Sequence, residues 1–411
     1  MTENGIKSAR ILLPNTTDMT AWSVIACDQF TSENEYWEEL EKKVSGKPTT
    51  LDLILPEIYL DEKTDERIAK INKNIESYLA KNLFKSLGDG YILTVRKTPF
   101  VERRIGLVGA VDLEKYEYSK KSQALIRSTE GTIEERIPPR LKIRKDAAVE
   151  FPHIMILFDD EKKEILETLY ENRSQYQKVY DFELNMGGGH IEGYFISDCK
   201  AVEKAFLTLL DSERLIKKYG KDDKFQFAVG DGNHSLATAK AHWNNIKAGL
   251  NEEEIQTHPA RYALAEFNNI YDEGIYFEPI YRFVSGVNRA DFIDKLSAVN
   301  GGTMGVYGEK EKGVVWSIKD NSLPQGIMEV DAFIKDYIAK FGGTVDYVHG
   351  EDNLIKLVDK GEDTVGILFN KLDKKDLFRY VSQKGAFPRK TFSMGENIEK
   401  RYYLEGRKIK C

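Results

Sequence analysis

The sequence contains little cysteine, and its three cysteines stand far apart. Cys27, Cys199 and Cys411 are isolated from one another and odd in number among 411 residues. This pattern argues against a disulfide framework and against a structural zinc site, and it fits a reducing compartment. We therefore expect a cytoplasmic protein.

Long apolar runs and a surplus of positive charge are also missing. No apolar segment approaches the roughly 20 residues of a membrane-spanning helix, and residues 1–10 lack the apolar core of a secretion signal. The 60 basic and 67 acidic residues give a net charge of -7, which argues against nucleic-acid and membrane partners. With 41% hydrophobic residues, the composition is that of a globular protein of two or three domains.

The densest polar chemistry in the sequence follows a predicted strand at residues 225–229. Alternating apolar residues predict that strand, and residues 236–249 have the spacing of a helix. Between the two stand Gly230, Asp231, Gly232, Asn233, His234 and Ser235. Glycines allow a sharp turn, and the first amides of a helix attract phosphate or carboxylate. The alternative is an ordinary turn in which Asp231 or Asn233 caps the helix.

Asp28 and an arginine-rich segment are further candidates. Asp28 follows a predicted strand at residues 22–27 and precedes a helix that a Ser32–Glu35 capping box would open, although a lone aspartate there is typical of an ordinary turn. Residues 127–144 carry Arg136, Arg140 and Arg144 at intervals of four, with prolines that favour a loop followed by a helix. Such arginines match phosphate oxygens, or they form a solvated face paired with glutamates.

The remaining pattern predicts an α/β fold with mixed sheets (α+β). Residues 152–158 predict a central strand in which His153 is structural, and residues 182–196 predict a hairpin with a glycine tip. Helices are expected at residues 66–87, ended by Gly88-Asp89-Gly90, and at residues 162–180 and 201–218. Helices and strands alternate beyond residue 285, so we expect a motif-bearing region at residues 1–284 and a smaller α/β region at residues 285–411.

Five segments of the sequence together carry a family resemblance. They are Arg127-Ser128-Thr129-Glu130-Gly131-Thr132 with Arg136, Pro152-His153-Ile154, the segment 230–235, Glu278-Pro279-Ile280-Tyr281-Arg282, and Pro388-Arg389-Lys390-Thr391-Phe392. In this order they resemble the bacterial family catalogued as domain of unknown function 1015, whose members often carry SpoOJ/ParA/ParB/RepB-like labels. The resemblance covers nearly the whole chain.

The resemblance implies a core like that of the ParB/sulfiredoxin/free-serine-kinase group, in which a nucleotide or phosphate lies against a strand-to-helix turn. The usual family turn is Asp-Gly-His-His-Arg, whereas here Asn233 replaces the first histidine and Ser235 replaces the arginine. Arg127, Arg136 or Arg140 would then supply the missing charge. The resemblance also implies a link to serine metabolism.

We therefore predict an enzyme that transfers a phosphoryl group or hydrolyses a phosphate ester on a small polar metabolite such as serine or phosphoserine. Asp28, Glu130 and His234 are equal candidates for the general base, and Asp231 would hold Mg²⁺ beside ATP or ADP. The predicted ligand contacts are Arg127, Thr129, Arg136, Arg140, Gly230, Gly232, Asn233, Ser235, Arg389 and Lys390. A nucleotide or metabolite sensor without turnover is the alternative, and a ParB-like DNA-associated protein is the third hypothesis.

Overall fold

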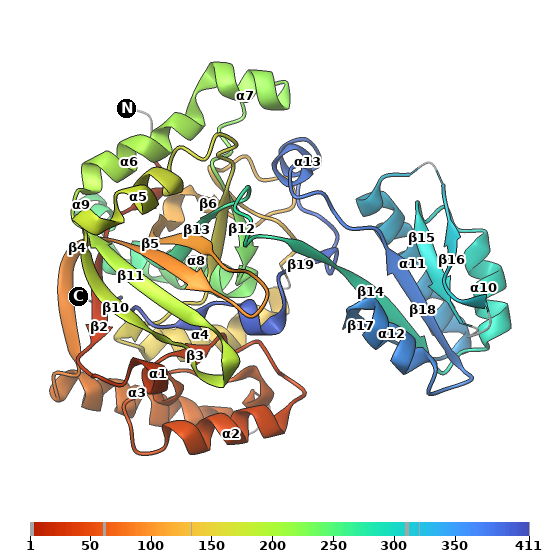
Figure 1. The fold of residues 1–411 in the computed structure, drawn as a ribbon, viewed down its shortest axis with the longest axis horizontal. Helices are drawn as coiled ribbons and strands as arrows, with labels where there is room; N and C mark the ends of the chain where they lie inside the picture. Colours follow the sequence, from red (N-terminus) through yellow and green to blue (C-terminus); the bar gives the residue numbers. More distant parts are fainter. Residues whose placement is uncertain (1–3, 61–62, 133, 309–311, 320, 411) are drawn as a thin grey trace. The chain divides into compact units, whose positions relative to one another are not determined.

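The chain forms two compact units, which we call the first and the second unit. The computed structural model describes every residue except 1–3, 61–62, 133, 309–311, 320 and 411, and it leaves the side chain of Arg136 undescribed. The first unit comprises Met1–Ile275, Val381–Ala386 and Glu396–Cys411, and the second comprises Tyr276–Tyr380 and Phe387–Gly395 (Figure 1). The boundary expected after residue 284 falls within a strand of the second unit, Phe277–Ser285.

A mixed 11-stranded sheet organises the first unit. Its strands are β1 (Ile6–Lys7), β2 (Ala9–Pro14), β4 (Phe84–Lys97), β5 (Arg104–Asp112), β6 (Tyr116–Glu117), β7 (Ile126–Ser128), β9 (Met155–Phe158), β10 (Gln177–Glu183), β11 (His190–Ile196), β12 (Phe227–Asp231) and β13 (Tyr262–Asn269). They follow the order β10-β11-β4-β5-β13-β9-β12-β7-β6, with β1 beside β5 and β2 beside β4. Strand β12 runs parallel to β7 and antiparallel to β9, so the end of β12 meets the end of β7 and the start of β9.

Both faces of this sheet are buried, because its strands alternate between two hydrophobic cores. In β4, Ile92 lies in one core, whereas Tyr91 and Leu93 lie in the other. The first core packs α1 (Met19–Trp22), α2 (Asn34–Val44) and α3 (Thr64–Ala80), and the second packs α5 (Leu166–Glu171), α6 (Cys199–Leu207) and α8 (Asn233–Lys247). Figure 1 shows α1 to α3 on one side of the sheet and α5 and α6 on the other.

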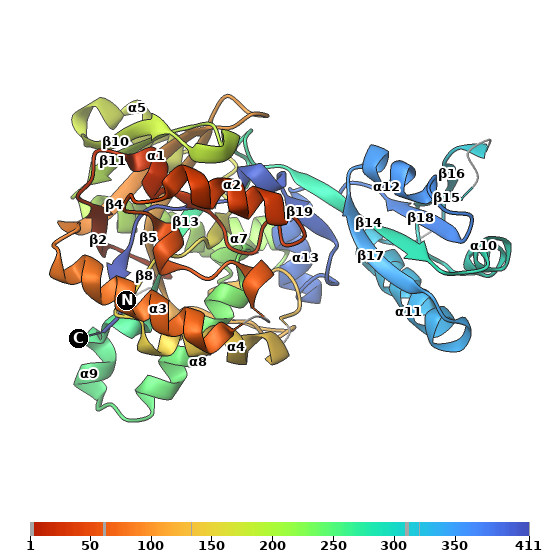
Figure 2. The same ribbon diagram turned by 90° about the horizontal axis from the view of Figure 1, so that it is seen from below.

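The end of the chain returns to the first unit, where its two strands pair with strands from earlier parts of the chain. The remaining elements of this unit are β3 (Val24–Ile25), β8 (Val149–Glu150), β20 (Tyr402–Tyr403), β21 (Arg407–Lys408), α4 (Ile137–Asp146), α7 (Ser212–Tyr219) and α9 (Glu252–Thr257). Strand β20 pairs with β3, and β21 pairs with β8. Helix α4 packs against α8, as Figure 2 shows. The 3-10 helices of this unit are η1 (Thr50–Leu53), η2 (Glu57–Tyr59), η3 (Leu113–Lys115), η4 (Glu134–Arg136), η5 (Arg173–Gln175), η6 (Asn185–Gly187), η7 (Thr208–Leu210), η8 (Pro259–Arg261) and η10 (Asn397–Glu399).

The second unit is a smaller α/β body. Its strands are β14 (Phe277–Ser285), β15 (Met304–Tyr307), β16 (Val315–Ser317), β17 (Thr344–His349), β18 (Thr364–Phe369) and β19 (Phe392–Met394), and its helices are α10 (Arg289–Ser297), α11 (Leu323–Phe341) and α12 (Glu351–Val358). The sheet has the order β16-β15-β18-β14-β17, with β19 also beside β14. The chain passes back to the first unit within α13 (Asp376–Lys384). These elements confirm the alternation predicted beyond residue 285.

The predicted α/β class with mixed sheets is confirmed, whereas three local predictions are wrong. The helix expected at residues 66–87 ends at Ala80, because Asn82 takes a left-handed conformation (φ 53°), and Gly88-Asp89-Gly90 lies inside β4, paired with β2. The helix expected at residues 162–180 ends at Glu171, and β10 replaces its second half by pairing with β11. Helix α2 forms, but the residue at its N-cap is Glu33, whose side chain makes no capping hydrogen bond. The capping box expected at Ser32–Glu35 is therefore absent. Among the described residues, no helix has the length and apolar character needed to cross a membrane.

Candidate functional site

The turn between β12 and α8 has the geometry that its glycine requires. Gly232 adopts a φ of 76° and stands at the start of α8, where no side chain caps the helix. A Cβ at this position would approach the Ile154 Cα to 3.1 Å, so any other residue would be both strained and crowded. The 15-residue helix α8 thus begins without a side-chain cap, and the first amides of a helix have no acceptor within the helix itself.

Strand β7 fixes this turn from the side. The Ser128 hydroxyl donates a hydrogen bond to Asn233 Oδ1, and Thr129 Oγ1 donates to the Val229 carbonyl at 2.6 Å. Both Thr129 and Asn233 are buried, at 2% and 7% exposure. The predicted ligand residues Thr129 and Asn233 thus hold the two strand ends together, whereas His234 and Ser235 in the first turn of α8 are half-buried.

His153, which lies just before β9, joins Asp28 to the end of the chain. Its Nδ1 lies 2.7 Å from the Tyr403 hydroxyl, and its Nε2 lies 3.6 Å from Asp28 Oδ2. Burial acts to lower the pKa of His153, but Asp28, Asp231 and Glu57 outweigh it, so the pKa is raised. Burial acts to raise the pKa of Asp28, yet His153 and Lys400 hold it well below its ordinary value. At neutral pH the Asp28 carboxylate is therefore ionised.

Lys400 places a positive charge at the end of β12. Its Nζ lies 3.5 Å from Asp231 Oδ2, and the two side chains are 6% and 18% exposed. Asp231 Oδ2 is itself buried and accepts no hydrogen bond from the described residues. The β20–β3 pairing, with Ala26 N donating to the Arg401 carbonyl, brings Lys400 and Tyr403 to the segment that carries Asp28. We call Asp28, His153, Asp231, Lys400 and Tyr403 the junction cluster.

The predicted arginines lie in other environments. Arg127 is 2% exposed and donates to both carboxylate oxygens of Asp223 and to the Ala124 carbonyl, so its guanidinium is engaged within the first unit. Arg140 forms an ion pair with Glu57. The Arg136 side chain lies outside the described part of the chain. Glu130 follows β7 and is half-buried.

Arg389 and Lys390 belong to the second unit, where the Lys390 carbonyl accepts a hydrogen bond from Arg282. The structure thus brings together Asp28 and Asp231 of the predicted residues and adds His153, Lys400 and Tyr403. The sequence pattern predicts a structural role for His153 and marks neither Lys400 nor Tyr403 as a site residue. No local pattern marks those two residues, because a pairing across nearly the whole chain places them.

The carboxylate of Asp231 is an oxygen ligand of the kind that Mg²⁺ prefers. The ammonium of Lys400, however, lies 3.5 Å from its buried oxygen. A divalent cation would be repelled there, so the residues present do not fit a Mg²⁺ site at Asp231. Elsewhere in the described chain, Asp181, His190 and Glu192 have ligand atoms within 4.8 Å of one another, but Lys178 Nζ already lies 2.6 Å from Asp181 and 3.5 Å from Glu192.

The structure places this protein in the mixed α/β fold class. Residues 6–362 match the family described as a protein of unknown function (DUF1015), and the chain belongs to that family. No curated protein sequence matches the chain.

Several solved structures share part of the arrangement of elements. A free serine kinase in complex with AMP has 9% identity and a TM-score of 0.40 over 73% of this chain and 91% of that one. A conserved hypothetical protein from Pyrococcus furiosus has 11% identity and a TM-score of 0.37 over 73% and 94%. SbnI from Staphylococcus aureus has 9% identity and a TM-score of 0.37 over 70% and 82%. These values are too low to transfer an activity.

Proposed function

We propose that the first unit is an enzyme of phosphoryl transfer or phosphate-ester hydrolysis that acts on a small polar metabolite such as serine or phosphoserine. One observation carries the proposal. The N-terminal turn of α8, which no side chain caps, the buried Lys400–Asp231 pair and the Asp28–His153–Tyr403 contacts converge at the end of β12. Phosphoryl chemistry needs these three elements, namely fixed donors for phosphate oxygens, a nearby cation and a group that accepts a hydroxyl proton.

In this proposal the phosphate binds to the first amides of α8 at Asn233, His234 and Ser235, where Gly232 lets the backbone approach it. Lys400 neutralises charge that develops on the phosphate, which is the role that sequence reasoning gave to the arginines. The Lys400 side chain is 6% exposed, and a charge in a site with little water acts more strongly than one at the surface. Asp231 holds the Lys400 ammonium in place.

Asp28 is the group that we propose to accept the hydroxyl proton of the substrate or of water. Its side chain is 29% exposed, whereas that of His153 is 7% exposed, so a substrate reaches the carboxylate more easily than the imidazole. A protonated His153 donates from Nε2 toward Asp28 and from Nδ1 to Tyr403, and a neutral one accepts at Nδ1 from the tyrosine hydroxyl. His153 is therefore a positioning residue, and its charged form holds the pKa of Asp28 low, which keeps Asp28 ionised. Glu130 and His234 remain alternative bases.

Ligand-induced stabilisation tests the binding part of the proposal. The melting temperature is measured with ATP, ADP, CTP, serine and phosphoserine, with and without Mg²⁺. A ligand at about one hundred times its dissociation constant stabilises the fold by roughly 2.7 kcal/mol. We expect a shift with a nucleotide or with phosphoserine in the wild type and in the control variant Lys42→Met, whose lysine is exposed on α2. The shift should be lost in Lys400→Met, which removes the proposed phosphate cation.

Turnover tests the catalytic part. Asp28→Asn should keep the ligand-induced shift and lose turnover of the ligand that causes it, because only the proton acceptor is removed. Binding without turnover in the wild type would favour the sensor hypothesis. A shift that survives in Lys400→Met, or no shift with any of the ligands, would overturn the proposed site.

A further inference from the structure

Helices α4 and α8 and the end of the chain line a cavity in the first unit. Its volume is about 390 Å³, within the usual range of small-molecule sites. The lining residues are Leu141, Lys145, His242, Asn245, Ile246, His258, Ile409 and Lys410. His242 lies nine residues beyond Asn233 on α8, about 14 Å along the helix axis. The cavity is thus distinct from the junction cluster.

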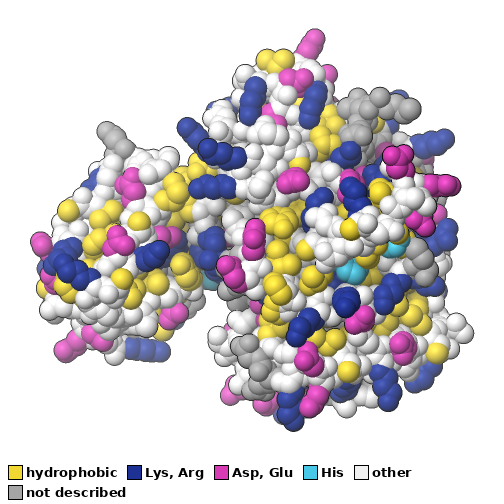
Figure 3. Space-filling view, turned by 180° about the vertical axis from the view of Figure 1, so that it is seen from behind, with side chains coloured by type: hydrophobic (Ala, Val, Ile, Leu, Met, Phe, Trp, Pro, Cys, Tyr) yellow, Lys and Arg dark blue, Asp and Glu magenta, His cyan; other side chains and the backbone are white. Residues whose placement is uncertain are grey.

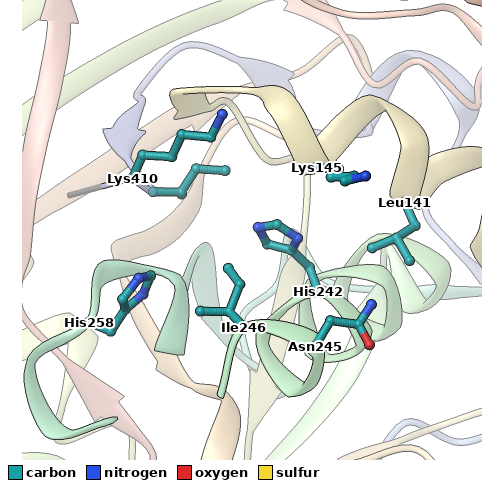
Figure 4. Close-up of a pocket in the computed structure, with 8 residues that line it drawn as sticks. Leu141, Lys145, His242, Asn245, Ile246, His258 and Lys410 are labelled. Carbon is teal, nitrogen blue, oxygen red and sulfur yellow. The ribbon is translucent and has the colours of Figure 1, made fainter. Parts of the chain in front are cut away.

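His242 is the polar group at the centre of this cavity. The residue is 5% exposed, and its imidazole points into the cavity from α8 (Figure 4). Burial, together with the charges of Arg144 and Lys410, lowers its pKa to about 4, so the ring is neutral at physiological pH. Within the part of the chain that the structure describes, its ring nitrogens meet no hydrogen-bond partner. Because the imidazole points into the cavity, its ring nitrogens are available to bond a molecule that enters there.

The surroundings of His242 combine apolar walls with a positively charged rim. Leu141, Ile246 and Ile409 supply apolar surface, and the exposed Lys145 and Lys410 supply ammonium groups. Lys410 donates a hydrogen bond to the Asp146 carbonyl at 2.7 Å, which holds its charge near the opening. Figure 3 shows hydrophobic side chains, histidine and flanking lysine or arginine gathered on one face of the first unit.

We propose that this cavity binds a small organic anion with an apolar body. The apolar body lies against Leu141, Ile246 and Ile409, the anionic group meets Lys145 and Lys410, and His242 hydrogen-bonds the ligand. A carboxylate and a phosphate monoester share this chemistry. The site is independent of the proposed phosphoryl chemistry, because none of its residues belongs to the junction cluster or to the first turn of α8.

Matched eight-carbon probes test this inference by titration calorimetry of the full chain. Octanoate, octyl phosphate, octanol and octylamine have the same apolar body and differ only in the head group. We expect saturable binding of octanoate or octyl phosphate at least tenfold tighter than that of octanol and octylamine. The tighter of the two anions identifies the preferred head group.

Two exposed positions allow variants that spare the core. Asn245→Trp narrows the opening and Lys145→Glu reverses a rim charge, and each should weaken anion binding at least tenfold. The matched control Lys42→Glu makes the same charge change on α2, so it should bind the probe normally. Equal binding of all four probes, or unchanged binding in both cavity variants, would overturn the inference. Failure of the phosphoserine and nucleotide tests would not affect it.

Discussion

Two groups of buried charges in the first unit differ in how fully their neighbours satisfy them. Arg401 donates to Glu266 and Glu405, and all three side chains are at most 5% exposed. Arg127 and Asp223 form a similar two-pronged pair, 2% and 4% exposed. In each group, two nitrogens of one planar guanidinium donate to carboxylate oxygens, and such paired contacts make an ion pair strong and rigid.

The junction cluster is paired more loosely. Its ion pairs span 3.6 Å between His153 and Asp28 and 3.5 Å between Lys400 and Asp231, and Asp231 Oδ2 accepts no hydrogen bond from the described residues. Charges that only stabilise a fold are met by short, multiple contacts. Charges that are only partly met keep bonding capacity for a ligand, and we take this difference as the mark of a functional site.

The largest loss of stability should follow from breaking the group that Arg401 forms with Glu266 and Glu405. Arg401→Met leaves Glu266 and Glu405 buried without their countercharge, which costs about 3–5 kcal/mol of unfolding free energy. Urea denaturation measures the loss. The control Arg10→Met removes an arginine whose pair with Asp89 is 72% and 59% exposed, so its cost should stay below about 1 kcal/mol. Equal losses in the two variants would show that the burial of Arg401 adds nothing.

A smaller, pH-dependent change in stability should follow from changing the junction cluster. The raised pKa of His153 contributes stability that is complete below its unfolded value of about 6.5 and is lost as the pH rises through the folded value. The lowered pKa of Asp28 contributes stability above about 3.9 that is lost as the pH falls through the folded value. The pair therefore stabilises most between about pH 4 and 6.5.

His153→Gln removes this titration while keeping a hydrogen-bonding side chain. Urea unfolding of the wild type from pH 5 to pH 8 should show a loss of stability that the variant lacks, and the two curves should approach each other at high pH. The control His349→Gln changes a histidine of the second unit and should follow the wild type. Parallel curves for wild type and His153→Gln would show that the Asp28–His153 pair has no stabilising role.

The sequence predicts the strand, turn and helix around residues 230–235, because the strand, the glycines and the helix are all local. The same holds for the alternation beyond residue 285 and for Asp28 at a strand end. Lys400 and Tyr403 could not be found in this way, since the pairing of Tyr403 with Val24 joins opposite ends of the chain and leaves no periodic signal. The partner of Arg127, Asp223, lies 96 residues further along the chain, so the charge pattern of residues 127–144 could not distinguish a buried ion pair from a phosphate site.

The smallest loss of stability should follow from removing His190, whose ion pairs are short but exposed. In the β10–β11 hairpin, His190 lies 2.8 Å from Asp181 and 2.9 Å from Glu183, closer than His153 lies to Asp28, but Glu183 is 72% exposed. Burial opposes and the two carboxylates favour the charged ring, so the pKa of His190 is raised. Solvent screens such pairs, and His190→Gln should therefore cost less than about 1 kcal/mol in urea denaturation. A loss as large as that of Arg401→Met would mean that distance, and not burial, decides the strength of the ion pairs in this protein.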